Sequence, residues 1–265
     1  MAARPILIYA AAAIFGVGGA SVAYAPASIA AWLVAKSSGG TVTIAQPSGT
    51  LWAGSGDVIV QSAQGIVRVP HFSWTLMPGR LWRGELAAAV LAEGPEISGS
   101  AEIGRTPSGL WLRNMQITAP LTLLTGSVAA LQPLGASGRL TARTAAVDVS
   151  ASAVSGSADV LIEHAQSARY GTLGDYRIAL EGATEVAKLN VTTLHGPLHI
   201  DGNGELSLGG QLRFRGQASV DAADRERFNP ILSFIGVPRP DGSVPLEWPL
   251  SGAGSLRGAP VVSVN

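Results

Sequence analysis

The sequence contains no cysteine, and its 18 basic residues are balanced by 18 acidic ones. The absence of cysteine excludes disulfides, thiolate metal sites and a cysteine nucleophile. Charged residues make up only 14% of the chain and the net charge is zero, so there is no overall field to attract nucleic acid. The 33 glycines and 16 prolines are too many for a helical bundle, whereas 47% hydrophobic residues argue against disorder. The composition therefore favours a folded protein that does not bind nucleic acid.

The longest uncharged segment is at the N-terminus, where no charged residue lies between Arg4 and Lys36. A helix from Pro5 to Ala25 is about 30 Å long at about 1.5 Å per residue, enough to span the hydrocarbon core of a bilayer. Pro26 can end this helix, because an interior proline removes a hydrogen bond and clashes with the preceding turn. The sequence therefore predicts a transmembrane helix over residues 5–25.

The alternative is a cleaved signal peptide, because Ala23-Tyr24-Ala25 matches the small-x-small pattern before a cleavage site. However, the apolar segment is longer than the usual core of about 7–15 residues. Pro26 would also become the first mature residue, so we favour a retained anchor. Because long domains cross the membrane largely regardless of charge, we predict a cytoplasmic head over residues 1–4, a linker over residues 26–40 and a periplasmic domain over residues 41–265. In a bacterium with two membranes, this is the topology of a single-pass inner-membrane protein.

Beyond the anchor, polar and apolar residues alternate, which is the pattern of half-buried strands. The clearest stretch is Gln211 to Asp221, preceded by the hairpin signal Gly209-Gly210, and Asp201-Gly202-Asn203-Gly204 predicts a further turn. Shorter alternating runs occur at Val58–Val60, Leu86–Leu91, Leu110–Ile117, Arg139–Val149, Ala158–Ile162, Tyr176–Leu180 and Leu189–Thr193. Turn signals lie between these runs at Gly94-Pro95, Pro107-Ser108-Gly109, Ser137-Gly138, Gly171, Gly182 and Gly196-Pro197. These patterns predict a mainly β fold, a curved antiparallel sheet with one apolar side.

One segment near the C-terminus has helical spacing instead. Its apolar residues are Phe228, Ile231, Leu232 and Ile235. Pro230 falls within this segment and predicts a bend. A turn over residues 238–242 and a strand over Ser243–Leu250 are expected to follow. The sequence thus predicts one short helix near the C-terminus of the β domain.

Two sequence patches resemble a known family. The first is Ser48-Gly49-Thr50-Leu51-Trp52-Ala53-Gly54, and the second, about twenty residues later, is Trp74-Thr75-Leu76-Met77-Pro78-Gly79-Arg80-Leu81. Their order after an N-terminal anchor is similar to type II secretion system protein N, and Asn229–Gly236 followed by Asp241-Gly242 resembles the end of that family. The resemblance implies an accessory inner-membrane component of the machine that exports folded proteins across the outer membrane. It also implies a scaffolding role for the periplasmic β domain, with other inner-membrane platform proteins and the secretin as partners.

The candidate interaction or structural residues lie within these two patches. They are Gly49, Thr50, Leu51, Trp52, Gly54, Trp74, Pro78 and Leu81. The tryptophans at positions 52, 74, 82 and 111 stand beside Leu and Val, so we expect burial in the core first and docking onto a partner second. Gly49 and Gly54 are expected to meet the backbone requirements of turns.

The sequence carries no recognisable pattern for catalysis or for a cofactor. The histidines are His71, His164, His195 and His199. The last two are four positions apart, but Gly196-Pro197 between them prevents alignment on a helix, and no HExxH pattern occurs. A GxSxG nucleophile elbow, a Walker sequence and a GxGxxG turn that opens a helix are also missing from the sequence. We therefore expect no enzyme activity, no cofactor and no metal.

Arginines gather late in the chain, at Arg213, Arg215, Arg225, Arg227 and Arg239. The first interpretation is a solvated surface, and the second is an anionic contact through Arg213 and Arg215, with an acidic strip of a partner or with lipid head groups. Lipid also enters the alternative function. A half-open sheet with an apolar inner face can cradle acyl chains, and an anchored β domain resembles the AsmA-type lipid-bridge proteins.

Overall fold

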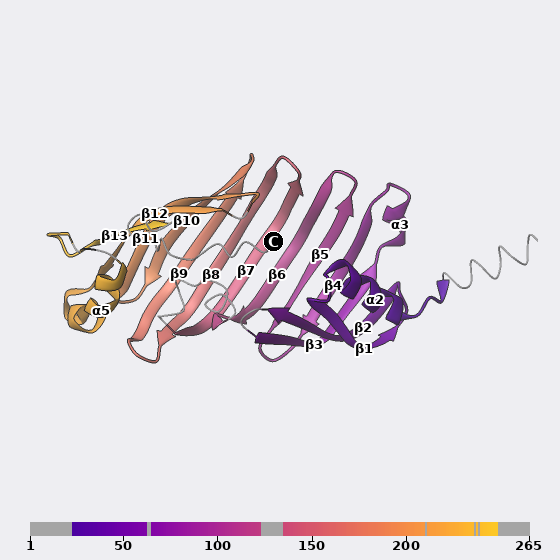
Figure 1. The fold of residues 1–265 in the computed structure, drawn as a ribbon, viewed down its shortest axis with the longest axis horizontal. Coiled ribbons are helices and arrows are strands. Elements are labelled where there is room, and N and C mark those ends of the chain that lie inside the picture. The colour runs from indigo at the N-terminus through magenta and orange to yellow at the C-terminus, as the bar shows by residue number, and fades with distance from the viewer. Residues whose placement is uncertain are drawn as a thin grey trace, which may run out of the picture.

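The structure is a computed structural model that describes residues 23–62, 65–122, 135–209, 211–235, 237 and 239–248. Its strands form one antiparallel sheet of thirteen strands, arranged in the order of the sequence (Figure 1). Each strand therefore pairs with the strand that follows it in the sequence, and β1 and β13 are the two edge strands. This is the open meander expected when short turns join successive strands.

The strands are β1 (Val42–Gly49), β2 (Ala53–Ser62), β3 (Gly65–Leu76), β4 (Leu86–Glu93), β5 (Ser98–Thr106), β6 (Gly109–Pro120), β7 (Ala136–Ser150), β8 (Val154–Ser167), β9 (Gly171–Gly182), β10 (Val186–His195), β11 (Leu198–Ser207), β12 (Leu212–Val220) and β13 (Val244–Trp248). The helices are α2 (Ala27–Ser37), α3 (Pro78–Leu81), the 3-10 turn η2 (Ala222–Asp224) and α5 (Arg225–Ile235).

The predicted fold class is confirmed in its main part: the protein is mainly β, with one antiparallel sheet and one short helix near the C-terminus. The alternating stretch from Gln211 to Asp221 forms β12, and the strand expected after residue 242 is β13. Pro230 lies inside α5, which runs on to residue 235.

The described part of the chain has no helix that combines the length and apolar character needed to cross a membrane. The transmembrane helix predicted over residues 5–25 lies outside the described residues except for Ala23 to Ala25. The segment over residues 26–40, for which the sequence predicts a linker, contains α2, and this helix packs against β1 and β2.

The turn predicted at Asp201-Gly202-Asn203-Gly204 is wrong, because these residues lie inside β11. The aromatic ring of Phe214 on β12 covers the two glycines. A Cβ on Gly202 would lie 2.6 Å from Phe214 Cζ, and a Cβ on Gly204 would lie 3.2 Å from Phe214 Cδ2. The glycines therefore make room for an aromatic side chain on the neighbouring strand, a role that does not require a turn. Ser137-Gly138 likewise lies within β7, at a point where the register with β8 shifts.

One face of the sheet is apolar over almost its whole length. Directly paired residues share a face, so the residues of this face can be followed from strand to strand through the pairing register. A first row crosses β3 to β12 in register: Leu76, Ala88, Ile103, Leu112, Val147, Gly156, Gly182, Ala187, Leu206 and Leu212. A second row crosses β3 to β13: Phe72, Ala92, Gly99, Ile117, Ala142, Val160, Ile178, Val191, Gly202, Gly216 and Leu246. We call these residues the apolar rows.

Helix α5 covers part of this apolar face at the β13 end of the sheet (Figure 1). Phe228 is fully buried and Leu232 is 4% exposed, in one cluster with Tyr170, Ala218 and Val244. The stacked rings of Tyr170 and Phe228 have centroids 6.2 Å apart. This cluster is the main hydrophobic core of the described residues, and it lies far from β1 along the sheet.

Candidate functional site

The first sequence patch forms the turn between β1 and β2. The Thr50 N–H donates to the Ala53 carbonyl at 2.8 Å, and the Ala53 N–H donates to Thr50 Oγ1 at 3.1 Å. Gly49 has a φ of +88°, and a Cβ there would lie 2.6 Å from the Ala53 carbonyl oxygen. Only glycine fits both requirements at this turn.

Trp74 of the second patch lies against this turn. It pairs with Gly54 across β2 and β3, and a Cβ on Gly54 would lie 2.5 Å from Trp74 Cζ2. The indole Nε1 donates to the Leu51 carbonyl at 3.1 Å, and the residue is only 7% exposed. The two patches therefore interlock, which the sequence alone does not show. We call Gly49–Gly54 together with Trp74 the motif corner.

The motif corner also holds the first described residues of the chain. The Leu51 N–H donates to the Ala25 carbonyl at 2.7 Å, and Pro26 forms an antiparallel bridge with Thr50. Helix α2 begins at Ala27, which is 2% exposed. The corner thus fixes where the chain from the N-terminal segment enters the sheet.

The remaining residues of the second patch lie beyond the corner. The Leu76 N–H donates to the Trp52 carbonyl at 2.7 Å, and α3 then begins with Pro78 in its first turn. Leu81 is 44% exposed and the next residue, Trp82, is 94% exposed. The expectation that Trp82 is buried is therefore wrong, because it follows a four-residue helix that projects from the β3–β4 connection.

Trp111, by contrast, is buried as expected, with 8% exposure, on the face of β5 and β6 that carries Gly104. A Cβ on Gly104 would lie 2.2 Å from the indole, so the ring takes the space above this glycine. The guanidinium carbons of Arg80 and Arg113 lie 4.7 Å and 5.5 Å from the ring centroid. Arg113 also forms an ion pair with Asp148 at 2.7 Å. Trp111 therefore ties the second patch, through Arg80, to the middle of the sheet.

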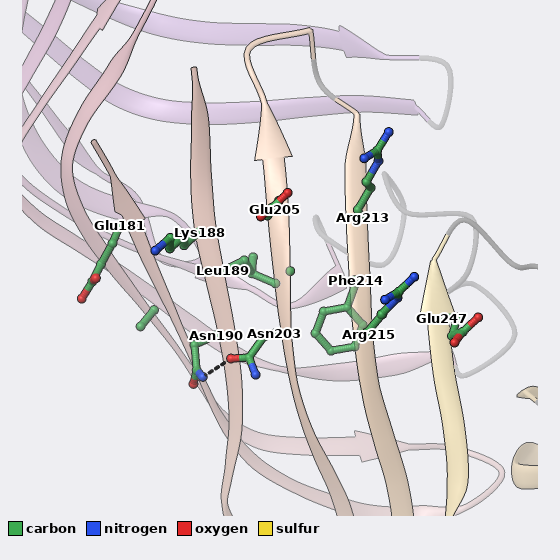
Figure 2. Close-up of a pocket in the computed structure, with 12 residues that line it drawn as sticks. Glu181, Lys188, Leu189, Asn190, Asn203, Glu205, Arg213, Phe214, Arg215 and Glu247 are labelled. Atoms are coloured by element: carbon green, nitrogen blue, oxygen red, sulfur yellow. Dashed lines mark hydrogen bonds between the residues drawn. The ribbon is translucent and has the colours of Figure 1, made fainter. Parts of the chain in front are cut away.

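A hollow of about 990 Å³ lies along β9 to β13, lined by charged and amide side chains together with Leu189, Gly204 and Phe214 (Figure 2). Charges of alternating sign line it in register, because Glu181 pairs with Lys188, Lys188 with Glu205, and Glu205 with Arg213. The neighbouring row consists of Asn190, Asn203, Arg215 and Glu247. An Asn190 Nδ2–Asn203 Oδ1 hydrogen bond of 2.7 Å joins the two amides. The structure thus brings Arg213 and Arg215 together in one hollow, which we call the charged hollow.

The charged hollow carries no net charge, because Arg213 and Arg215 lie beside Glu205 and Glu247. None of the six ion pairs in the described part of the chain involves its acidic or basic side chains. Of the other late arginines, Arg227 is paired with Asp224 at 2.9 Å. The hollow can therefore offer both donors and acceptors to a polar partner.

Among the ionisable side chains with shifted pKa values, Tyr176 and Asp57 make contacts that stabilise the fold. Burial raises the pKa of Tyr176 well above its ordinary value of about 10, and its hydroxyl lies 3.0 Å from the Leu173 carbonyl and 2.9 Å from the Leu198 carbonyl. A hydrogen bond from Arg68 lowers the pKa of the half-buried Asp57 carboxyl. Within the described ranges, no three His, Asp or Glu side chains form a group that could hold a metal ion.

The fold and the motif corner define an elongated β-protein built from one open sheet, whose sequence motifs lie where the chain enters that sheet. The family model for type II secretion system protein N matches residues 40–247, which run from the start of the sheet to β13. The match covers more than half of the chain, so the protein belongs to the type II secretion system protein N family, as its motifs predict, and is a component of that system. Neither the curated proteins nor the solved structures include a match to this chain.

Proposed function

We propose that the protein is an accessory inner-membrane component of the type II secretion system, anchored by the helix predicted over residues 5–25. Its N-terminus lies in the cytoplasm and its sheet in the periplasm, where the sheet helps to assemble the machine that exports folded proteins. Its partners are the inner-membrane platform proteins and the secretin. Family membership supports the choice of machine, and the uncharged segment before Lys36 supports the anchor.

The observation that carries the scaffold role is the attachment of the chain at the motif corner. Ala25, the last residue of the predicted anchor, accepts a hydrogen bond from Leu51, and Leu51 accepts one from the Trp74 indole. These contacts support a direct connection between the sheet and the predicted anchor, and such a connection holds the sheet at a fixed place relative to the membrane. A thirteen-stranded sheet held at one end offers two long faces for contact with several partners at once.

Site-specific crosslinking in cells tests this role. A photo-crosslinking residue at Asn203 in the charged hollow, or at the exposed Leu110 on the apolar face of β6, is expected to capture other secretion components. The same variants in a strain without the remaining secretion genes should give no such products. Normal export in a strain that lacks this protein, together with the absence of crosslinks to any secretion component, would overturn the proposal.

A second candidate function is lipid binding or lipid guidance by the sheet, and the apolar rows favour it. No charged residue interrupts either row over β3 to β12. At about 4.8 Å between strands, nine steps give an apolar track of roughly 43 Å. Ile103 within the first row and Leu110 close to it are 44% and 56% exposed, so hydrocarbon can reach this face. A track of this length can accommodate extended acyl chains laid across the strands.

Bound lipid distinguishes the two candidates. The full chain, extracted in mild detergent and examined by native mass spectrometry, can retain phospholipid at the predicted anchor in either case, so variants of the sheet are needed to identify lipid held by the apolar rows. Ile103→Asp places a charge on the apolar face of β5, whereas Ser100→Asp places one on the opposite face of the same strand. A lower phospholipid content in Ile103→Asp alone supports the second candidate, and an equal content in wild type and both variants removes it.

A further inference from the structure

Helix α2 turns its largest apolar side chains away from the rest of the protein. Ile29, Trp32 and Leu33 are 39%, 57% and 47% exposed. With Lys36 they occupy positions i, i+3, i+4 and i+7, which form one stripe along a helix. The side chain that α2 buries is the small Ala27, and the helix contacts β1 and β2. An apolar stripe that is left outside the core requires a partner of its own.

The composition of this stripe matches the interface of a lipid bilayer. Tryptophan rings favour the depth of the head groups, and isoleucine and leucine favour the upper acyl region. The Lys36 ammonium lies over the Trp32 ring, with Nζ 4.7 Å from the ring centroid. From there a long lysine side chain can reach lipid phosphates while its methylene groups stay on the apolar surface. Lys36 is the only charged residue of α2.

The position of α2 points to the same partner. Its first residue is Ala27, two positions after the end of the segment predicted to span the membrane. Pro26 separates the two, has an extended backbone and is bridged to Thr50, so the chain is attached to the sheet at the motif corner before α2 begins. Figure 1 shows α2 at the N-terminal end of the sheet, beside the first described residues. At about 1.5 Å per residue, α2 is roughly 16 Å long, and its stripe begins at Ile29, only four residues after the end of the predicted span and so within reach of the head groups.

We propose that α2 lies on the periplasmic surface of the inner membrane, with Ile29, Trp32 and Leu33 inserted into the head-group and acyl boundary. This inference rests on the anchor in the proposed function. It adds the orientation of the sheet relative to the membrane. Because α2 packs against β1 and β2, a helix lying in the membrane surface holds these strands close to the bilayer. The β13 end of the sheet then extends away from the point of anchoring.

The absence of cysteine makes a clean test available. Single cysteines at Leu33 and, separately, at Ile29 are labelled with the environment-sensitive fluorophore NBD in the full chain. The matched control is Ser152→Cys, an exposed position in the turn between β7 and β8. The labelled proteins are reconstituted into vesicles of phosphatidylethanolamine and phosphatidylglycerol. We expect a blue shift of about 10–20 nm and quenching by spin-labelled lipid at positions 29 and 33, but neither at position 152.

Resistance of the protein to alkaline extraction from the vesicles reports the anchor independently. An anchored protein whose labels at positions 29 and 33 remain in water overturns this inference and leaves the proposed function standing. If the protein is washed off the vesicles, the predicted anchor is wrong, and the inference that rests on it fails as well. If the blue shift requires added secretion proteins and lipid does not quench it, the stripe is a protein interface and the inference fails.

Discussion

The Trp74 ring lies directly above the α-carbon of Gly54, leaving no room for a side chain on the glycine. A Cβ on Gly54 would be 2.5 Å from Trp74 Cζ2 and 2.8 Å from the Ser48 carbonyl oxygen. The first of these atoms belongs to a buried ring and the second to the backbone, so neither can move aside cheaply. This contact explains why a glycine and a tryptophan about twenty residues apart occur together in the sequence.

We expect Gly54→Ala to destabilise the protein by about 1–3 kcal/mol, the usual cost of overpacking a filled site. Thermal unfolding of the purified protein measures it, and a shift of several degrees downward is expected. Gly79→Ala in the second patch is the matched control, because a Cβ there meets no atom within 4 Å. If both variants unfold at the wild-type temperature, the contact between the two motifs does not contribute to stability.

Trp111 and Trp82 give a second comparison, because the sequence leads to the same expectation for both and the structure separates them. Trp111 is 8% exposed beneath Arg80 and Arg113, whereas Trp82 is 94% exposed. We expect Trp111→Ala to cost about 3–5 kcal/mol. Trp82→Ala should change stability by no more than about 0.5 kcal/mol. Urea denaturation of both variants measures the two free energies, and equal losses would contradict the structure.

These residues show how far the sequence determines the fold. Alternation over residues 211–221 was sufficient to predict β12, because burial on one face imposes a period of two. A glycine predicts a turn wrongly where it makes room for an aromatic ring on another strand. Gly202 lies under Phe214, and that contact depends on the pairing of β11 with β12.

In the candidate site too, the sequence identifies single residues but does not show the contacts between distant segments. The motif residues were identified from the sequence, but their contact with Ala25 depends on a backbone hydrogen bond that leaves no trace in the side chains. The charged hollow is similar, because the alternation of Glu181, Lys188 and Glu205 appears only when three strands are in register. An arginine cluster read along the chain therefore looks like a basic patch, although carboxylates balance it across the strands.

The charged hollow leads to a prediction about partners. We expect the double variant Arg213→Gln and Arg215→Gln to fold normally, with an unfolding temperature within about 2 °C of wild type, because neither arginine is in an ion pair with the described residues. Recovery of secretion partners with the tagged protein should fall several-fold, and more so at low salt. Arg139→Gln, an exposed arginine on β7, is the control. Unchanged recovery from the double variant removes the anionic-contact role.

Tyr176 provides a prediction about pH. Its hydroxyl is buried between the Leu173 and Leu198 carbonyls, and burial raises its pKa above the ordinary value of about 10. Since the folded pKa is the higher one, the unfolded chain releases this proton first as the pH rises. The contribution of Tyr176 is therefore fully present below about pH 10 and is lost progressively as the pH rises towards the folded pKa.

We expect Tyr176→Phe to lower the free energy of unfolding at pH 7 by about 1 kcal/mol, because the buried carbonyls lose a donor. Between pH 9.5 and pH 11 the wild type should lose more stability than this variant, so the difference between them should shrink. Urea denaturation of both proteins across this range measures the two slopes. Parallel slopes would show that Tyr176 ionises equally in the folded and unfolded chains, and that the phenol is not held neutral between β9 and β11.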